Sequence, residues 1–301
     1  FEEGPGMKRA REIQQGLFFI SALGLSVLVY LEVKLPQETL VVILALLVAV
    51  VGLPHGALDP LVARKAGLWR NPSGLARFIG AYLFLAAIAG LLWVWAPKFS
   101  LAAFLAYSSW HFAGDWRDWL SRGWRLCAGS TVICAPSLFY PDHVAGYFSA
   151  LTGEDATTLV RVLQSLAIPA LAGTIYSVAR SFRTRPTVAA ELAILAASAL
   201  ALPPLVFFLL YFCGLHSPRH LIATAQGMDS TTAIATATGL TLLTVGLGAL
   251  FFVLLPSAQF DQRLLQITFI GLAVLTVPHM ILIEHYATRI AKAPNSGNTT
   301  A

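Results

Sequence analysis

Long apolar segments recur along almost the whole chain and restrict what it can fold into. A helix needs about 20 apolar residues to cross the hydrocarbon core of a bilayer, and most of these segments approach that length. Only 12% of the residues are charged, against about 25% in a typical soluble domain. We therefore predict an all-α fold, a polytopic integral membrane helical bundle with about eight to ten spans. The segments cover roughly residues 16–34, 38–54, 76–96, 99–113, 124–140, 157–179, 187–202, 204–216, 233–255 and 265–283.

The basic residues lie mainly in short loops between the apolar segments, and they predict the orientation of the bundle. Because cytoplasmic loops are enriched in lysine and arginine, we expect the N-terminus to be cytoplasmic. The formal charge of +5 does not indicate a nucleic-acid partner, because these residues form no stripe. The groups that set the orientation are Lys8, Arg9, Arg11, Arg64, Lys65, Arg70, Arg117, Arg122, Arg125, Arg180, Arg183 and Arg185.

The soluble segments are too short to form a second domain. We read residues 1–6 as a cloning remnant, residues 7–292 as a single transmembrane domain, and the polar residues 293–301 as a disordered tail. Three cysteines lie in or beside apolar segments with no paired spacing, so we expect small buried side chains and no disulfides. They are Cys127, Cys134 and Cys213.

Two adjacent prolines, Pro203 and Pro204, divide the apolar stretch 187–216. A single kinked helix over this stretch would place His216 on the opposite side of the membrane from His55. A turn at the prolines would instead return His216 to the cytoplasmic side. Proline lacks a backbone donor and disfavours helical geometry in the preceding residue. We therefore expect the turn, with the kinked helix as the alternative.

Histidine recurs at the ends of these apolar segments. His55, His111, His216 and His220 lie in three short clusters, and His279 follows a proline as His55 does. Imidazole is costly to place near hydrocarbon, so repeated histidine in a membrane segment indicates a functional site. Imidazole is also the commonest metal ligand among side chains. We predict a metal site near the cytoplasmic ends of several helices.

An aspartate follows two of these histidines at a spacing of one helical turn. Asp59 comes after His55, and Asp115 comes after His111. Residues four apart share a helix face, and a ligating imidazole usually donates its other N–H to a carboxylate or carbonyl. We therefore expect each aspartate to orient the histidine of its own motif. The alternative is a polar helix end at the headgroups, with the aspartate as an ordinary loop charge.

The remaining histidines have further polar neighbours. Residues 217–218 are Ser-Pro, which suits the start of a helix and lets His216 and His220 converge on one ion. The alternative is a histidine-rich turn near the headgroups that binds nothing. His279 is followed by Glu284, which could orient a ligating imidazole or pair with a buried arginine.

The ligand types narrow the metal and the class of protein. Four imidazoles without thiolate suit iron, copper or zinc, whereas calcium and magnesium prefer oxygen ligands. The His-Glu-x-x-His motif of zinc proteases is absent from the sequence, and a di-iron desaturase or hydroxylase would need more ligands. A membrane metal or haem transport or binding protein would spread its ligands across the bilayer. Clustering at one face would favour a single metal centre.

Three motifs together resemble a known family. They read Pro-His-Gly-Ala-x-Asp at residues 54–59, Trp-His-Phe-x-x-Asp at 110–115 and His-x-x-Arg-His at 216–220. In this order and in a chain of this size, they resemble the bacterial Brp/Blh family of β-carotene 15,15′-dioxygenases. The resemblance implies a multi-pass enzyme of the bacterial cytoplasmic (inner) membrane that uses Fe(2+) and O2. Such an enzyme cleaves the central double bond of β-carotene into two retinal molecules, which makes residues 7–292 the catalytic domain.

The resemblance, taken together with the residue patterns described above, assigns roles to individual residues. Carried over by motif, the iron ligands would be His55, His111, His216 and His220, and His279 matches a further Pro-His of the family. From their neighbours in the sequence, the candidate additional ligands or supporting residues are His279, Asp59, Asp115 and Glu284. Aromatic residues near the motifs would hold the polyene, although each would equally suit a core or lipid-facing position. These are Tyr107, Trp110, Phe112, Phe208, Tyr211 and Phe212.

One residue departs from the family pattern, because Ala113 stands where a glycine is expected after Phe112. This leaves the ligand assignment intact but weakens the inference of close packing at that position. The implied partners are the carotenoid, O2 and membrane lipid, with a retinal-accepting opsin as a further candidate. The alternative function is metal or haem binding or transport, or another oxidative lipid-modifying metalloenzyme. The oligomeric state is left open.

Overall fold

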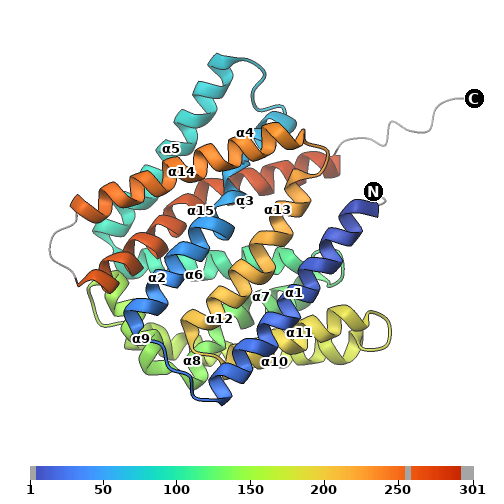
Figure 1. The fold of residues 1–301 in the computed structure, drawn as a ribbon, viewed down its shortest axis with the longest axis vertical. Coiled ribbons are helices and arrows are strands. Elements are labelled where there is room, and N and C mark those ends of the chain that lie inside the picture. Colours follow the sequence, from blue (N-terminus) through green and yellow to red (C-terminus); the bar gives the residue numbers. More distant parts are fainter. Residues whose placement is uncertain (1–4, 255–258, 293–301) are drawn as a thin grey trace, which may run out of the picture.

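A computed structural model describes residues 5–254 and 259–292, and every regular element in these ranges is helical (Figure 1). Residues 1–4 of the predicted cloning remnant and the predicted tail 293–301 lie outside the described residues. The helices are α1 (Pro5–Tyr30), α2 (Gln37–Leu47), α3 (Leu53–Ala57), α4 (Asp59–Lys65), α5 (Pro72–Trp95), α6 (Pro97–Ala113), α7 (Arg122–Cys134), α8 (Pro136–Phe139), α9 (Pro141–Thr152), α10 (Thr157–Ser181), α11 (Pro186–Ala201), α12 (Pro204–Tyr211), α13 (Ser217–Ala225), α14 (Ser230–Leu254) and α15 (Phe260–Lys292). Two π-helical turns, η1 (Val48–Gly52) and η3 (Phe212–His216), and the 3-10 turn η2 (Gly114–Trp116) complete the chain order.

The predicted polytopic membrane bundle is confirmed, with a smaller number of long helices than expected. In the described part of the chain, seven stretches are long and apolar enough to cross a bilayer. The predicted segments 99–113, 124–140 and 187–202 instead form the shorter helices α6, α7 with α8, and α11. The seven long stretches are Lys8–Tyr30, Gln37–Lys65, Pro72–Trp95, Thr157–Ser181, Pro204–Ala225, Ser230–Leu254 and Phe260–Glu284.

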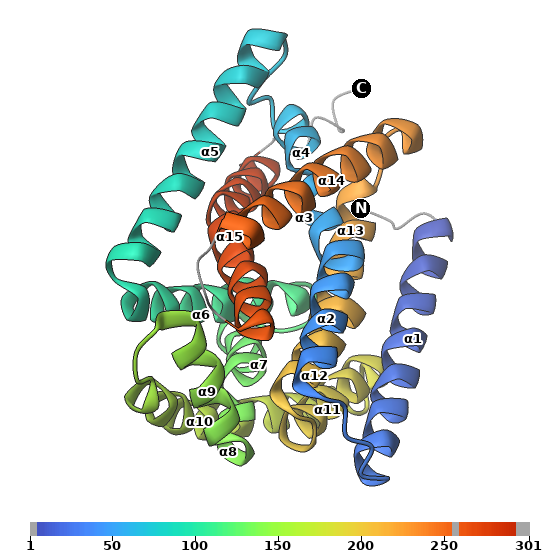
Figure 2. The same ribbon diagram turned by 60° about the vertical axis from the view of Figure 1, so that its left-hand side comes forward.

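The predicted break at Pro203–Pro204 is confirmed. Helix α11 ends at Ala201, Leu202 has extended backbone with ψ of 144°, and α12 begins at Pro204. The hydroxyl of Tyr140 donates a hydrogen bond of 2.7 Å to the carbonyl of Ala201, which holds this turn beside the start of α9. From the turn, α12, η3 and α13 run back toward the end of the bundle where α1 begins (Figures 1 and 2).

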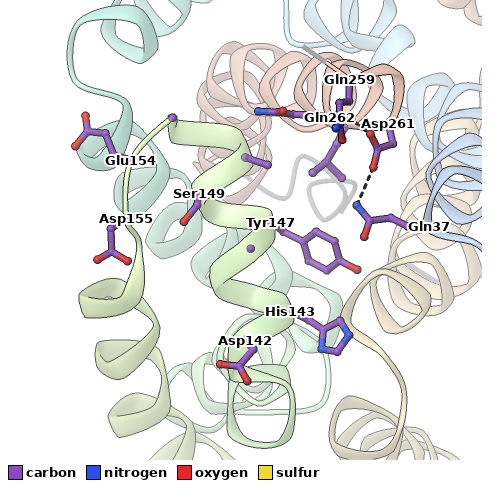
Figure 3. Close-up of a pocket in the computed structure, with 14 residues that line it drawn as sticks. Gln37, Asp142, His143, Tyr147, Ser149, Glu154, Asp155, Gln259, Asp261 and Gln262 are labelled. Atoms are coloured by element: carbon purple, nitrogen blue, oxygen red, sulfur yellow. Dashed lines mark hydrogen bonds between the residues drawn. The ribbon is translucent and has the colours of Figure 1, made fainter.

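Polar side chains join the loops at one end of the bundle. Lys98 at the start of α6 pairs with Glu154, which lies between α9 and α10, at 2.8 Å. Gln37 at the start of α2 donates to the carboxylate of Asp261 at the start of α15, at 2.9 Å. Gln37, Glu154 and Asp261 also line a pocket of about 720 Å³, and most of its lining residues are polar (Figure 3).

At the opposite end of the bundle, basic side chains donate hydrogen bonds to the backbone of other loops. Arg185 donates to the carbonyl of Trp119 at 2.5 Å, and Lys65 donates to the carbonyl of Gln226 at 2.6 Å. The first turns of α1 reach the same end, because the guanidinium of Arg11 lies 4.3 Å from the ring centroid of Trp119. Loops that the positive-inside pattern assigns to one face therefore lie together.

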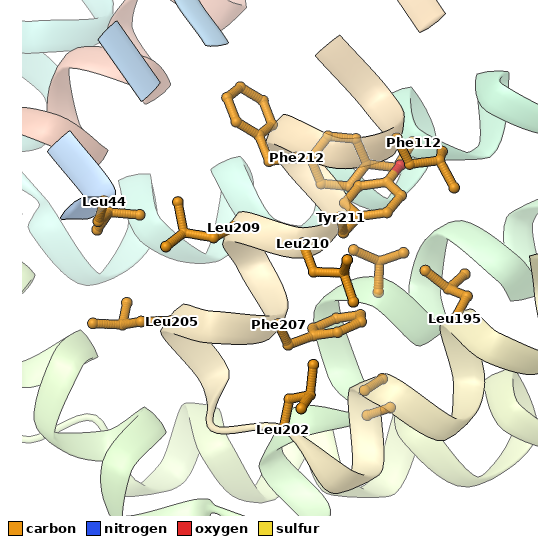
Figure 4. Packing of buried hydrophobic residues seen from close by; sticks show 14 of the residues in the cluster. Leu44, Phe112, Leu195, Leu202, Leu205, Phe207, Leu209, Leu210, Tyr211 and Phe212 are labelled. Carbon is orange, nitrogen blue, oxygen red and sulfur yellow. The ribbon is translucent and has the colours of Figure 1, made fainter. Parts of the chain in front are cut away.

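Buried apolar side chains around α12 and η3 form the main core (Figure 4). Phe207 and Tyr211 of this stretch are fully buried, and they pack in one cluster with Leu195 of α11 and Leu44 of α2. Lipid tails are as apolar as these side chains, so helix association in a bilayer depends on close packing. The core therefore fixes η3, which carries His216, by shape complementarity.

Close packing between α6 and α7 depends on Gly129. A Cβ atom at this position would overlap the carbonyl of Ser109 and lie 2.6 Å from the backbone nitrogen of Ala113. Backbone atoms cannot move aside as a flexible side chain can. At this contact the small residue is therefore Gly129 of α7, and not a glycine at position 113 of α6. His111 lies between the two contacted residues, so this packing sets its position.

We expect Gly129→Ala to lower the Tm of the purified protein in detergent. The added methyl group forces α6 and α7 apart, and overpacking of this kind costs about 1–3 kcal/mol. Gly123→Ala is the matched control on the same helix, because no atom lies within 4 Å of the Cβ position there. Equal Tm values for the two variants would contradict the packing role of Gly129.

Candidate metal centre

The structure brings together the four histidines predicted as ligands, and His279 joins them. His55 lies in α3, His111 in α6, His216 at the end of η3, His220 in α13 and His279 in α15. The ring centroids of neighbouring histidines are 4.8 to 5.8 Å apart. The side chains of His55, His216 and His279 are buried, and the other two are partly buried. Five imidazoles from distant parts of the chain therefore share one place.

Their donor atoms lie at a spacing that suits one ion. The imidazole nitrogens that His111, His220 and His279 offer lie within 4.8 Å of one another. Metal–nitrogen bonds are about 2.0–2.1 Å long, so two ligands on opposite sides of an ion are about 4 Å apart. Small ring movements would place these donors on a single metal.

Two of the histidine-bearing stretches contain a π-helical turn. Turn η1 ends two residues before Pro54, and η3 ends at His216 itself. In these turns the N–H of Leu53 donates to the carbonyl of Val48, and that of Ser217 donates to that of Phe212. Such turns are frequent at functional sites. Here they set the rotation of the following residues toward the cluster.

Pro218 and Gln14 position the pair His216 and His220. Because Pro218 has no N–H, the carbonyl of Gly214 four residues earlier lacks its usual helical donor. The side-chain amide of Gln14 on α1 donates to this carbonyl at 2.8 Å. Helix α1 thereby satisfies the interrupted backbone next to the histidines.

The two aspartates contact histidines, but not those of their own motifs. Asp59 accepts from Nδ1 of His279 at 2.9 and 3.0 Å, and Asp115 accepts from Nδ1 of His216 at 3.1 Å through both oxygens. The predicted pairing within each motif was wrong because the helix ends between the two residues. Helix α3 stops at Ala57, and α6 stops before the 3-10 turn that holds Asp115.

These contacts leave the other ring nitrogen of each histidine available. Within the described residues, Nε2 of His216 and Nε2 of His279 are buried and have no hydrogen-bond partner. An unpaired buried polar atom costs about 1–3 kcal/mol. A carboxylate can only accept a hydrogen bond, so the ring proton of each histidine sits on Nδ1. Nε2 is then the unprotonated nitrogen, which is the one that binds a metal.

Among the remaining histidines, His55 has a similar arrangement. Nδ1 of His55 donates to the carbonyl of Gly52, which also leaves Nε2 unprotonated. Nδ1 of His220 lies 3.4 Å from the hydroxyl of Thr224. Neutral imidazoles without thiolate are a donor set that fits iron, copper or zinc. The residues present therefore fit the predicted metal.

A buried ion pair contacts the backbone beside the cluster and helps to hold it in place. Arg219 donates to the carboxylate of Glu191 on α11 at 2.5 Å and to the carbonyl of Asp115 at 3.1 Å. Trp116 donates to the same carboxylate at 2.9 Å. Glu191 was not predicted, although a lone ionisable residue in an apolar segment is itself a signal of function.

Two tyrosine hydroxyls complete the surroundings of the aspartates. Tyr82 of α5 donates to Asp59 at 2.8 Å, and Tyr211 donates to Asp115 at 2.6 Å. Tyr82 belongs to no motif and was not predicted. Tyr211 was predicted to contact substrate, but its hydroxyl binds a carboxylate inside the core.

Three of the other predicted aromatic residues lie at the cluster or next to it. The ring of Phe112 is 4.8 Å from that of His216, and the ring of Phe212 is 5.9 Å from that of His55. Phe208 stacks on Phe212 at 5.1 Å. These residues give the cluster an apolar wall.

The remaining predicted side chains make no ring contact or hydrogen bond with the five histidines in the described part of the chain. Trp110 is 45% exposed, and Tyr107 is partly buried. Glu284 lies 3.7 Å from Arg117 in a half-exposed ion pair, so its partner is an arginine, although not a buried one. The pocket of Figure 3 lies at the start of α15, away from His279. Asp261 in its wall precedes His279 by 18 residues of helix, which is about 27 Å.

Comparisons with known proteins agree with the motifs. The family model for β-carotene 15,15′-dioxygenase matches residues 46–286, which include all five clustered histidines. A β-carotene 15,15′-dioxygenase from uncultured marine bacterium 66A03 is 34% identical over 252 residues, covering 79% of this chain and 90% of the relative. No solved structure matches the chain. The resemblance inferred from the three motifs is confirmed, and the chain belongs to the β-carotene 15,15′-dioxygenase family.

Proposed function

We propose that this protein is an iron(II)-dependent dioxygenase that cleaves the central 15,15′ double bond of β-carotene with O2 to give two retinal molecules. The observation that carries the proposal is the cluster of five histidines in a member of this family. A relative named for this reaction supplies the substrate class. The unpaired Nε2 atoms of His216 and His279 support a resident metal.

The overall reaction balances with O2 alone. One carbon–carbon double bond breaks, and each of its two carbons gains one oxygen atom to become an aldehyde, so no other oxidant or reductant is needed. Bound iron(II) would supply the site at which O2 is activated for this cleavage. The protein's part is to hold the ligands, place the double bond and keep water away.

The residues around the cluster suit these tasks. Asp59 and Asp115 hold His279 and His216 in the form that leaves Nε2 free. Imidazole ligands are neutral, so these residues would leave the positive charge of a bound ion uncompensated. Phe112, packed against His216, restricts the access of water.

A row of aromatic rings offers a path for an apolar polyene. The ring of Phe269 on α15 is 5.0 Å from that of Phe208, which stacks on Phe212 at 5.1 Å. Phe212 in turn lies beside His55. We propose that the carotenoid lies along this row, so that its central bond reaches the histidine cluster.

The proposal extends to the location of the enzyme. We propose that residues 7–292 form the catalytic domain within a bacterial cytoplasmic (inner) membrane, with the N-terminus and the basic loops in the cytoplasm. The carotenoid would then enter from the surrounding lipid, and a retinal-accepting opsin in the same membrane could receive the product.

We expect the metal-free protein to produce retinal from β-carotene only after anaerobic loading with iron(II) and then addition of O2. Products are separated by chromatography. His216→Ala removes a central donor and should abolish retinal formation. His143→Ala is the matched control, because this residue lies at the pocket of Figure 3 and should retain full activity.

Two outcomes would contradict the proposed activity. The first is absence of retinal from a protein shown to be loaded with iron and to bind β-carotene. The second is equal retinal formation by the chelator-treated and the iron-loaded protein. Cleavage to other aldehydes would instead contradict the central position of the cut.

We expect His279→Ala to bind iron(II) at least about tenfold more weakly than the unaltered protein. Its Nδ1 is held by Asp59 and its Nε2 is unpaired, so the substitution should remove one donor. Metal content after dialysis, measured by mass spectrometry, checks this, with His143→Ala as control. Unchanged iron content would exclude His279 from the ligands and leave the four predicted histidines.

We expect the two ends of the bundle to face opposite sides of the membrane. In a variant without Cys127, Cys134 and Cys213, a membrane-impermeant maleimide added to spheroplasts should label Asp155→Cys. It should label Lys8→Cys only after the membrane is permeabilised. The reverse pattern would contradict a cytoplasmic N-terminus, and labelling of both from outside would contradict the spanning arrangement.

A further inference from the structure

We infer that Tyr82 and Tyr211 are positioning residues of the metal centre, each acting on one histidine through an aspartate. The inference rests on the proposed function, because it assigns the histidines to a metal. It concerns two hydroxyl groups that neither the motifs nor the comparisons single out. Each tyrosine would fix which nitrogen of its histidine faces the ion and how the ring is turned.

The first chain of contacts joins α5, α4 and α15. The hydroxyl of Tyr82 donates to Oδ2 of Asp59 at 2.8 Å. Asp59 accepts a hydrogen bond from Nδ1 of His279, at 2.9 Å through Oδ1 and at 3.0 Å through Oδ2. The carbonyl of Leu275 is a second neighbour of the hydroxyl, but at 3.4 Å it is the weaker acceptor. Tyr82 therefore supplies a second donor to the carboxylate that holds His279.

The second chain has the same order of groups in another part of the molecule. The hydroxyl of Tyr211 donates to Oδ2 of Asp115 at 2.6 Å. Asp115 accepts a hydrogen bond from Nδ1 of His216, at 3.1 Å through both of its oxygens. The two chains share no residue and come from different helices. Their common pattern is tyrosine hydroxyl, aspartate carboxylate and imidazole Nδ1.

A separate observation selects the same two histidines. Nε2 of His216 and Nε2 of His279 are the only imidazole nitrogens in the described residues that are buried without a hydrogen-bond partner. The two imidazoles held by aspartate–tyrosine pairs are thus the two with a free, buried donor atom. Such an atom costs free energy unless a ligand meets it. This coincidence connects the tyrosines with a ligand at the centre of the cluster.

The physical role follows from the number of donors that each carboxylate receives. With one donor, a carboxylate can turn about its bond to Cβ, and the imidazole can turn with it. A second donor, from α5 for Asp59 and from one turn before His216 for Asp115, fixes the plane of the carboxylate and hence the direction of Nε2. In surroundings of little water these hydrogen bonds are strong, and losing one is costly. Partners of this kind commonly change metal affinity by about 10–100-fold when removed.

The test compares three tyrosine-to-phenylalanine variants of the full chain. Tyr82→Phe and Tyr211→Phe each remove one hydroxyl from the chains above. Tyr140→Phe is the matched control, because its hydroxyl donates to the carbonyl of Ala201 and does not bond to an aspartate. Iron(II) affinity is measured by competition with a chelator, and cobalt(II) is added as a probe whose visible spectrum reports ligand geometry. The Tm of the metal-free protein reports any purely structural effect.

We expect both site variants to bind iron(II) about tenfold more weakly and to change the cobalt(II) spectrum, whereas Tyr140→Phe leaves both unchanged. A lower Tm in the metal-free variants, with unaltered affinity and spectrum, would reduce the tyrosines to structural residues and overturn the inference. Failure of the unaltered protein to bind iron(II) and cobalt(II) would overturn the proposed function itself. The two failures are therefore distinguishable.

A double substitution tests whether Tyr82 acts through Asp59. If it does, Tyr82→Phe should weaken iron(II) binding in the unaltered protein but have little further effect in Asp59→Ala, because the acceptor that transmits its effect is gone. Equal effects of Tyr82→Phe in the two backgrounds would show independent action and contradict the chain of contacts.

Discussion

Hydrogen bonds between two buried aspartates and two histidines join the parts of the chain that the site requires. Asp59 links the start of α4 to His279 in α15, and Asp115 links the turn after α6 to His216 at the end of η3. Bonds to a carboxylate are stronger than bonds between neutral groups, and burial strengthens them further. The contacts that set the donor atoms of the histidines therefore also hold together the helices that carry them.

Buried charge around these contacts is balanced by further polar contacts. Glu191 and Arg219 form an ion pair with side chains 1% and 10% exposed, and Arg219 also reaches the backbone of Asp115. Breaking a buried pair by removing one partner typically costs about 3–5 kcal/mol, since a charge is left without compensation. Helix α1 closes this side, with Gln14 on the carbonyl of Gly214. The network therefore fixes the backbone on which His216 depends.

Local rules predicted much of the fold and the members of the cluster, but not how the site is connected. Bilayer thickness sets the length of the apolar segments, and the prolines at 203–204 define a break that propensity alone places. Histidine near hydrocarbon marked the cluster for the same kind of reason. The partners of Asp59 and Asp115 depend on where α3 and α6 end and on which distant helix then lies opposite each carboxylate. Tyr82 gave no signal, because one tyrosine in an apolar helix is unremarkable.

Each aspartate contacts a histidine outside its own motif, and a helix end between the histidine and the aspartate of the motif makes this possible. On a continuous helix, Asp59 would lie on the same face as His55, one turn along. The interruption at Leu58 instead frees Asp59 for His279, while His55 takes a backbone carbonyl as its partner. The same argument holds for Asp115 after the end of α6. Each motif thus supplies one imidazole to the cluster and one carboxylate to a histidine from another helix, so neither motif can build its share of the site alone.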